Sequence, residues 1–205
     1  MTQAEQEEKV KEIVLRHSYI AGGIALIPIP GVSEIAVVVN QLTMYGKIND
    51  VIGIKLSENF LKIAGKFLIS QVICIVGGFA AVLGIAAVLK FIPGLNFLAG
   101  FAAAPAAGIG NYICGLAYYY MLRDTIEASG GAENFAQLTP DEQAALLKLH
   151  KLNKEKMESI REQAKSKLKN ADYKSFKKEG EAVAEEARRN KSQYDDILKD
   201  VHGER

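Results

Sequence analysis

Hydrophobic and polar positions are distributed very unevenly along this chain of 205 residues. From Phe67 to Leu122, 56 consecutive residues include a single charged side chain, Lys90. The 23 uncharged residues between Lys66 and Lys90 would form about 35 Å of helix, because each helical residue adds about 1.5 Å. That length is enough to cross the hydrocarbon core of a bilayer, which is about 30 Å thick.

A turn signal divides this apolar stretch into two helices. Pro93 and Gly94 follow the first long run, and proline and glycine are the strongest breaks in a helical pattern. We therefore predict an antiparallel helical hairpin over residues 67–122, whose second helix is kinked or broken at Pro105. Tyrosines gather near the end of that second helix, as aromatic residues do at a membrane interface: Tyr112, Tyr118, Tyr119 and Tyr120.

The preceding region repeats this design on a smaller scale. An apolar stretch beginning at His17 is broken at Pro28, Pro30 and Gly31, and a second apolar helix begins at Val32. The two Ile-Pro-Gly turns predict an internal pseudo-repeat. Each arm of the first unit has only about 10 to 15 apolar residues, too few to span a bilayer alone. We expect this unit to be re-entrant, interfacial or packed against the hairpin.

Small residues recur four positions apart in the apolar stretch. In lipid, this spacing lets helix backbones approach closely, so it predicts a packing face within the hairpin or between subunits. The positions are Ala80, Gly84, Gly100, Ala104 and Gly108.

The charged C-terminal part contains strong helix signals. Thr139 is a helix cap, Pro140 suits the first helical position, and Glu142 completes a capping box. Apolar residues then follow at helical spacing, which predicts an amphipathic helix over residues 140–170 and a more polar one over 172–201. These two helices are expected to pair as a hairpin or to dock on a partner.

Together these patterns predict an all-α protein. Two helix–Pro-Gly–helix units form a membrane-type bundle over residues 1–129, and a C-terminal amphipathic helical hairpin occupies residues 130–205. Gly130 and Gly131 mark the joint between them. The alternative is a soluble bundle that buries the central hairpin, but few amphipathic helices are present to cover two helices that are apolar all round.

Charge placement predicts the orientation. The N-terminus is acidic, unlike a secretory signal, and Lys or Arg residues flank the hairpin while only Lys90 lies at its turn. The positive-inside rule then places both termini in the cytoplasm, with the hairpin in the membrane. The flanking basic residues are Lys47, Lys55, Lys62, Lys66 and Arg123.

Two ionisable residues lie in apolar surroundings next to the first Pro-Gly turn. His17 and Glu34 at membrane depth would mark a proton or ion path. The structural alternative is that Glu34 merely interacts with the dipole at the start of its helix. Both interpretations stay open at the level of the sequence.

The chain carries no pattern typical of an enzyme. It has no nucleophile constellation and no phosphate-binding loop, so it is not itself a P-loop GTPase. Cys74 and Cys114 lie in the apolar stretch and are expected to pack as small hydrophobic residues. A net charge of +1 lacks the basic excess that is typical of proteins that bind nucleic acid. We therefore expect no catalytic residues, no cofactor and no metal.

The order of these features resembles the YcjF-like domains, a bacterial family of unknown function that accompanies Era-like GTPases. The matching features are Pro28 to Pro30, Lys90 to Gly94 and the glycines Gly100, Gly108, Gly110 and Gly115, within residues 14–122. The resemblance implies a membrane-associated helical module whose nucleotide chemistry belongs to a separate GTPase. The chain departs from the family in lacking a GTPase domain and in its C-terminal tail.

Three functions fit this sequence. The first is a non-catalytic membrane-anchored module that recruits a partner through residues 139–201, or that assembles copies of itself. The second is a pore-forming protein whose hydrophobic hairpin permeabilises a membrane. The third is a soluble oligomeric helical regulator.

Overall fold

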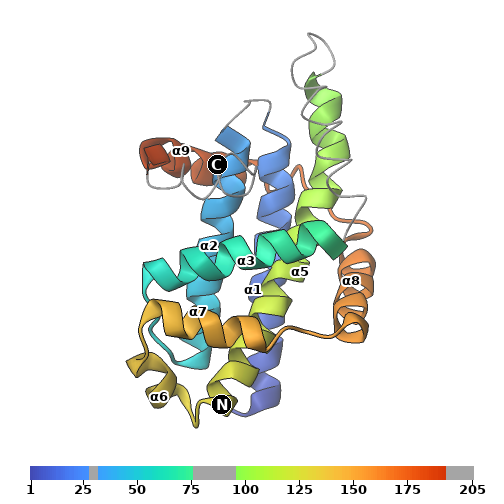
Figure 1. The fold of residues 1–205 in the computed structure, drawn as a ribbon. Coiled ribbons are helices and arrows are strands. Elements are labelled where there is room, and N and C mark those ends of the chain that lie inside the picture. Colours follow the sequence, from blue (N-terminus) through green and yellow to red (C-terminus); the bar gives the residue numbers. More distant parts are fainter. Residues whose placement is uncertain (28–31, 76–95, 193–205) are drawn as a thin grey trace.

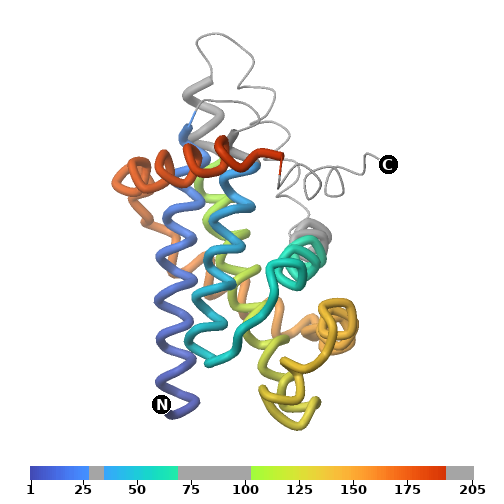
Figure 2. The backbone as a smooth tube through the Cα atoms, turned by 90° about the vertical axis from the view of Figure 1, so that its left-hand side faces the viewer, coloured from blue at the N-terminus to red at the C-terminus, as the bar shows by residue number. Residues whose placement is uncertain are grey.

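The computed structural model describes residues 1–27, 32–75 and 96–192, and the side chains of residues 1–27, 35–68 and 103–192. Every regular element in these ranges is an α-helix, which confirms the predicted all-α class. Three long helices lie side by side and form the body (Figures 1 and 2): α1 (Gln3–Ala25), α2 (Val32–Ile52) and α5 (Asn96–Ala128). α1 is antiparallel to both others.

Five shorter helices cover this body: α3 (Glu58–Ile75), α6 (Ala132–Gln137), α7 (Pro140–Leu149), α8 (Lys154–Leu168) and α9 (Lys177–Arg189). α3 crosses the body, and α7 runs alongside α3 (Figure 1). α8 packs against α5, while α9 crosses α1 and α2 at the end opposite the N-terminus (Figure 2).

The helix start predicted at Thr139 is confirmed. The Thr139 hydroxyl accepts from the backbone N–H of Glu142, whose carboxylate accepts from the backbone N–H of Thr139. The same capping box, made by Thr2 and Glu5, begins α1. Each box satisfies backbone N–H groups that have no partner inside the helix.

The single helix predicted over residues 140–170 is wrong, because the chain forms two. α7 ends at Leu149, and Asn153 starts α8 by accepting from the backbone N–H of Lys156 at 2.8 Å. An asparagine that caps a helix favours a new start over continuation of the old helix. The break lets α7 lie on α3 and α8 lie on α5.

The C-terminal hairpin is also not formed in the described part of the chain. α8 buries its apolar side against α5, and α9 buries its own against α1 and α2. The buried side chains are Met157, Ile160, Ala164 and Leu168 in α8, and Ala184 and Ala187 in α9.

The last part of the predicted membrane hairpin lies in the core of this bundle. α5 is buried at every position from Gly110 to Leu122, and its four tyrosines lie inside the protein, in place of an interface belt. α5 also continues through Pro105, so the predicted break there is absent. Among the described residues, no helix combines the length and hydropathy needed to cross a bilayer.

The predicted turns fall outside the described residues. This applies to Pro28, Pro30, Gly31, Pro93 and Gly94. Of the helices that flank them, α1 ends and α2 and α5 begin at one end of the body, whereas α3 crosses the body below that end (Figure 1). We call this the apolar end, and we call the opposite end, with the N-terminus and α6, the polar end.

Charge is segregated along the long axis of the body. In α1, the charged residues run from Glu5 to Arg16, and none follows between His17 and Ile27. In α5, the first charged residue is Arg123, close to the polar end. Within α1 and α5 the charged residues thus lie toward the polar end, whereas α9, which crosses the apolar end, is charged along its exposed side.

Candidate functional site

A tyrosine from the tail lies between the body helices at the apolar end. The ring of Tyr173 packs over Gly22 of α1 and Gly108 of α5. A Cβ at Gly108 would lie 2.7 Å from the Tyr173 hydroxyl oxygen, and one at Gly22 would overlap the ring. Both positions therefore need the absence of a side chain for Tyr173 to fit.

The Tyr173 hydroxyl is buried without a hydrogen-bond partner in the described part of the chain. Only 8% of the residue is exposed. Burial raises the pKa of Tyr173 to about 12, so the hydroxyl keeps its proton at neutral pH. Because an unpaired buried hydroxyl costs about 1–3 kcal/mol, a group that accepts its proton would be stabilising.

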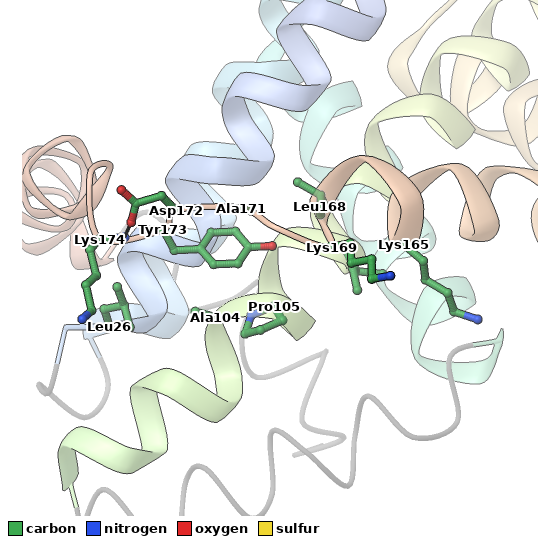
Figure 3. Close-up of a pocket in the computed structure, with 11 residues that line it drawn as sticks. Leu26, Ala104, Pro105, Lys165, Leu168, Lys169, Ala171, Asp172, Tyr173 and Lys174 are labelled. Carbon is green, nitrogen blue, oxygen red and sulfur yellow. Dashed lines mark hydrogen bonds between the residues drawn. The ribbon is translucent and has the colours of Figure 1, made fainter.

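This hydroxyl points into a hollow of about 540 Å³ (Figure 3). The floor of the hollow is apolar and comes from α1, α5, α8 and the segment before α9: Leu26, Ala104, Pro105, Ile109, Leu168 and Ala171. Its rim carries Lys165, Lys169, Asp172 and Lys174. Figure 3 shows the hydroxyl directed toward the α8 side, above Ala104 and Pro105.

The rim has a positive balance, with three lysines against one aspartate. Lys165 forms an ion pair with Glu162 at 2.6 Å on the outer face of α8. Asp172 accepts from the backbone N–H of Lys174 at 3.2 Å, which orders the turn that carries Tyr173. An apolar floor, a single buried donor and a cationic rim together suit an amphipathic anion.

The predicted residue His17 lies in a different place, a buried polar network in the middle of the body. Its Nδ1 lies 2.8 Å from Oδ1 of Asn40, and its Nε2 lies 3.1 Å from Nζ of Lys47. Asn40 also donates to the carbonyl oxygen of His17 at 3.0 Å and to Oδ1 of Asn111 at 3.5 Å. The network therefore joins α1, α2 and α5.

These contacts fix the state of the imidazole. An amide oxygen only accepts, so Nδ1 carries the proton, and Nε2 accepts from the ammonium group of Lys47. Burial lowers the pKa of His17 below its ordinary value of 6.5, and the positive charges of Lys47 and Arg16 lower it further against the opposing hydrogen bond to Asn40. His17 is thus a neutral structural link between helices.

The other predicted residues are distributed as follows. The side chain of Glu34 and the positions Ala80 and Gly84 lie outside what the structure describes, and Gly100 lies near the beginning of α5. Ala104 and Gly108 both contact Tyr173. In the described ranges, no three His, Cys, Asp or Glu side chains cluster as a metal site requires.

Sequence reasoning missed the hollow. The helix predicted over residues 172–201 would include Tyr173, whereas the residue lies in the turn that precedes α9. The glycines that receive its ring are about 150 and 65 positions away in the chain, so no local pattern connects them. The sequence offered one signal for this contact, a glycine-rich stretch, but it did not indicate which residue packs against the glycines.

Comparisons with protein-family models, curated proteins and solved structures gave no match. No family is therefore shown for this chain. The resemblance to the YcjF-like domains stays a prediction from the sequence.

Proposed function

We propose that this protein is a non-catalytic helical module that associates with a membrane through its apolar end. In this proposal the residues 69–102, whose only charged side chain is Lys90, contact the bilayer. The folded body stays at its surface. The orientation keeps both termini in the cytoplasm of a bacterial cell, at the inner membrane.

The observation that carries the proposal is the lengthwise segregation of charge. Burial inside the bundle accounts for the apolar character of α5 from Gly110 to Leu122. We propose that residues 69–102, which are almost free of charge, are instead accommodated by lipid. Those residues directly precede the buried part of α5, whose beginning lies at the apolar end (Figure 1).

The tail is proposed to recruit a partner, either a separate protein such as a GTPase or a second copy of the chain. α7, α8 and α9 already bury their apolar sides against their own body. A partner would therefore meet their polar outer faces, where Lys and Glu alternate in ion pairs such as Arg161 with Glu158. Such contacts are expected to weaken as salt rises.

Flotation of the full chain with liposomes tests the proposal. Leu83→Asp places a charge in the apolar run and should abolish flotation, since a carboxylate at the centre of a membrane helix costs about 2.5–3.5 kcal/mol. Ala136→Asp makes the same change in net charge on the exposed side of α6 and should float like the unmodified chain. Equal flotation of both variants, or none of the unmodified chain, would contradict membrane association.

A second candidate function is favoured by the burial of α5. An apolar helix covered by amphipathic ones is also what a pore-forming protein needs before it opens. Release of a trapped dye from the same liposomes separates the two functions. Stable flotation without release supports the module, and rapid release supports the pore. A chain that stays in the aqueous fraction as a defined oligomer would support the soluble regulator.

A further inference from the structure

We propose that the hollow around Tyr173 is a binding site for an anionic phospholipid. The head group would lie at the lysine rim, and the first part of the acyl chains would lie on the apolar floor. This inference rests on the proposed membrane association, and it assigns to the body a specific lipid contact separate from the apolar run.

The first argument is the unpartnered hydroxyl. Tyr173 is more than nine-tenths buried, and its hydroxyl has no acceptor among the described residues. Tyr119 is the other buried hydroxyl without a partner, but it packs beside Tyr120 and does not line the hollow. A phosphate oxygen in the hollow would give Tyr173 a charge-assisted hydrogen bond, which is stronger than a neutral one.

The second argument is the distribution of charge around that hydroxyl. Lys165 comes from the last turn of α8, Lys169 is its C-cap residue, and Lys174 comes from the opposite side of the Tyr173 ring (Figure 3). Lys169 lies on the side to which the hydroxyl points and contributes positive potential there, while Lys165 is paired with Glu162 (Figure 3). The single carboxylate at the rim, Asp172, accepts a backbone N–H and so belongs to the turn. The chemistry selects an anion over a cation.

The third argument is the apolar floor and its size. Six of the lining residues are apolar, and a hollow of about 540 Å³ falls in the range of about 300–1,000 Å³ that small-molecule sites occupy. A free phosphate ion would leave the floor of Ala104, Pro105 and Leu168 unused. A head group with its glyceryl ester portion would cover both the rim and the floor.

The fourth argument is rigidity. Gly22 and Gly108 hold the ring of Tyr173 on both sides, and Tyr19 packs edge-on against it with ring centroids 6.4 Å apart. Phe176 stacks on Tyr19 in turn, at 5.0 Å. The hydroxyl is therefore held in place before any ligand arrives, which lowers the entropic cost of binding.

The test uses the full chain and dioctanoyl phosphatidylglycerol below its critical micelle concentration, with binding measured by calorimetry. Tyr173→Phe keeps the ring and its packing, and it should weaken binding about tenfold, the loss expected for a hydrogen bond to a charged group. Lys169→Gln should weaken binding about fivefold at low salt. Lys167→Gln, an exposed lysine of α8 that does not line the hollow, is the matched control and should bind normally.

Two further probes make the outcome decisive. Dioctanoyl phosphatidylcholine should bind at least tenfold more weakly, and inorganic phosphate at the same concentration should not compete. Unchanged affinity in Tyr173→Phe, or full competition by phosphate alone, would overturn the lipid site. Flotation on liposomes depends on residues 69–102, so failure of this site with intact flotation leaves the proposed function standing.

Discussion

The two ends of the bundle solve the problem of buried polar groups in different ways. At the polar end, the Tyr118 hydroxyl donates to Oδ1 of Asn49 at 2.8 Å, and the Tyr120 hydroxyl donates to Glu7 at 3.0 Å. Glu7 also pairs with Lys11 at 2.9 Å. At the apolar end, the Tyr173 hydroxyl has no acceptor in the described residues and opens on a hollow.

This difference indicates that the two ends of the bundle have different roles, one in stability and the other in binding. The polar end is completed mainly by partners from its own chain, with the Tyr119 hydroxyl as the exception in the described residues, so its contribution is stability. The apolar end combines the uncharged segments of α1 and α5 with a hollow, a charged rim and an unpaired donor, so part of its surface is suited to an external ligand. Substitutions at the polar end should therefore change stability and leave lipid affinity intact, while substitutions in the hollow should do the reverse.

The largest effect is expected at the polar end, from Phe135→Ala. Phe135 of α6 is fully buried and packs edge-on against Phe60 of α3, with ring centroids 6.0 Å apart. Removing a buried aromatic ring costs about 3–5 kcal/mol, so urea denaturation should show a loss of that size. Leu149→Ala, at a residue that is 77% exposed, should change stability by less than about 0.5 kcal/mol. A loss of stability in Phe135→Ala that is as small as the loss in Leu149→Ala would mean that α6 is not part of the core.

The next effect concerns the crossing of α9 over α1. A Cβ at Gly180 would lie 2.8 Å from the backbone nitrogen of Ile24 and 3.0 Å from the carbonyl carbon of Gly23. Backbone atoms cannot rotate away, so Gly180→Ala should destabilise the protein by about 1–3 kcal/mol, as overpacking does.

Gly46→Ala is the matched control for this substitution. A Cβ at Gly46 of α2 would have nothing within 4 Å, and alanine favours a helix over glycine by about 1 kcal/mol. This variant should be slightly more stable than the unmodified chain. If both glycine variants shift the thermal midpoint in the same direction, the close crossing of α9 and α1 is incorrect.

A smaller effect is expected from pH. Because the pKa of His17 is lower in the folded chain than its ordinary value of 6.5, the unfolded chain binds more protons just below that pH. Stability should therefore fall on acidification through about pH 6.5 and level off below the folded pKa. His17→Gln cannot take up this proton, so its unfolding free energy should decrease less between pH 7 and pH 5. Parallel pH profiles for the two proteins would contradict a buried neutral imidazole.

The smallest effect is expected from the ion pair between Arg16 and Glu179. It joins α1 to α9 at 3.2 Å, but both side chains are substantially exposed. Exposed pairs contribute about 0–1 kcal/mol, so Arg16→Gln should lower stability by no more than that and should lose its effect in high salt. A larger loss, persisting at high salt, would mean that this contact is less solvated than the structure indicates.

Local signals in the sequence predicted local features of the fold well. The all-α class followed from the helical periodicity, and the start of α7 followed from Thr139, Pro140 and Glu142. Both depend on residues that are close together in the chain. The break before α8 was missed because Asn153 is a modest cap within an otherwise periodic pattern.

Tertiary placement could not be predicted in the same way. A charge-free helix has the same pattern whether lipid or protein surrounds it, so the burial of α5 from Gly110 to Leu122 was not distinguishable from a membrane helix. Likewise, Gly108 was interpreted as a helix-packing position, and only its contact with Tyr173 identifies what it accommodates. In both cases the surroundings of the residue are formed by segments that are distant in the sequence.

The most direct test of the account is which end of the bundle faces lipid. A fluorophore can be placed at the apolar end by Ser175→Cys or at the polar end by Glu133→Cys, both exposed positions, in a Cys74→Ser chain where Cys114 stays buried. With liposomes that contain a head-group quencher, the account predicts quenching of the label at residue 175 and little change at residue 133. Equal quenching at both positions, or stronger quenching at residue 133, would contradict it.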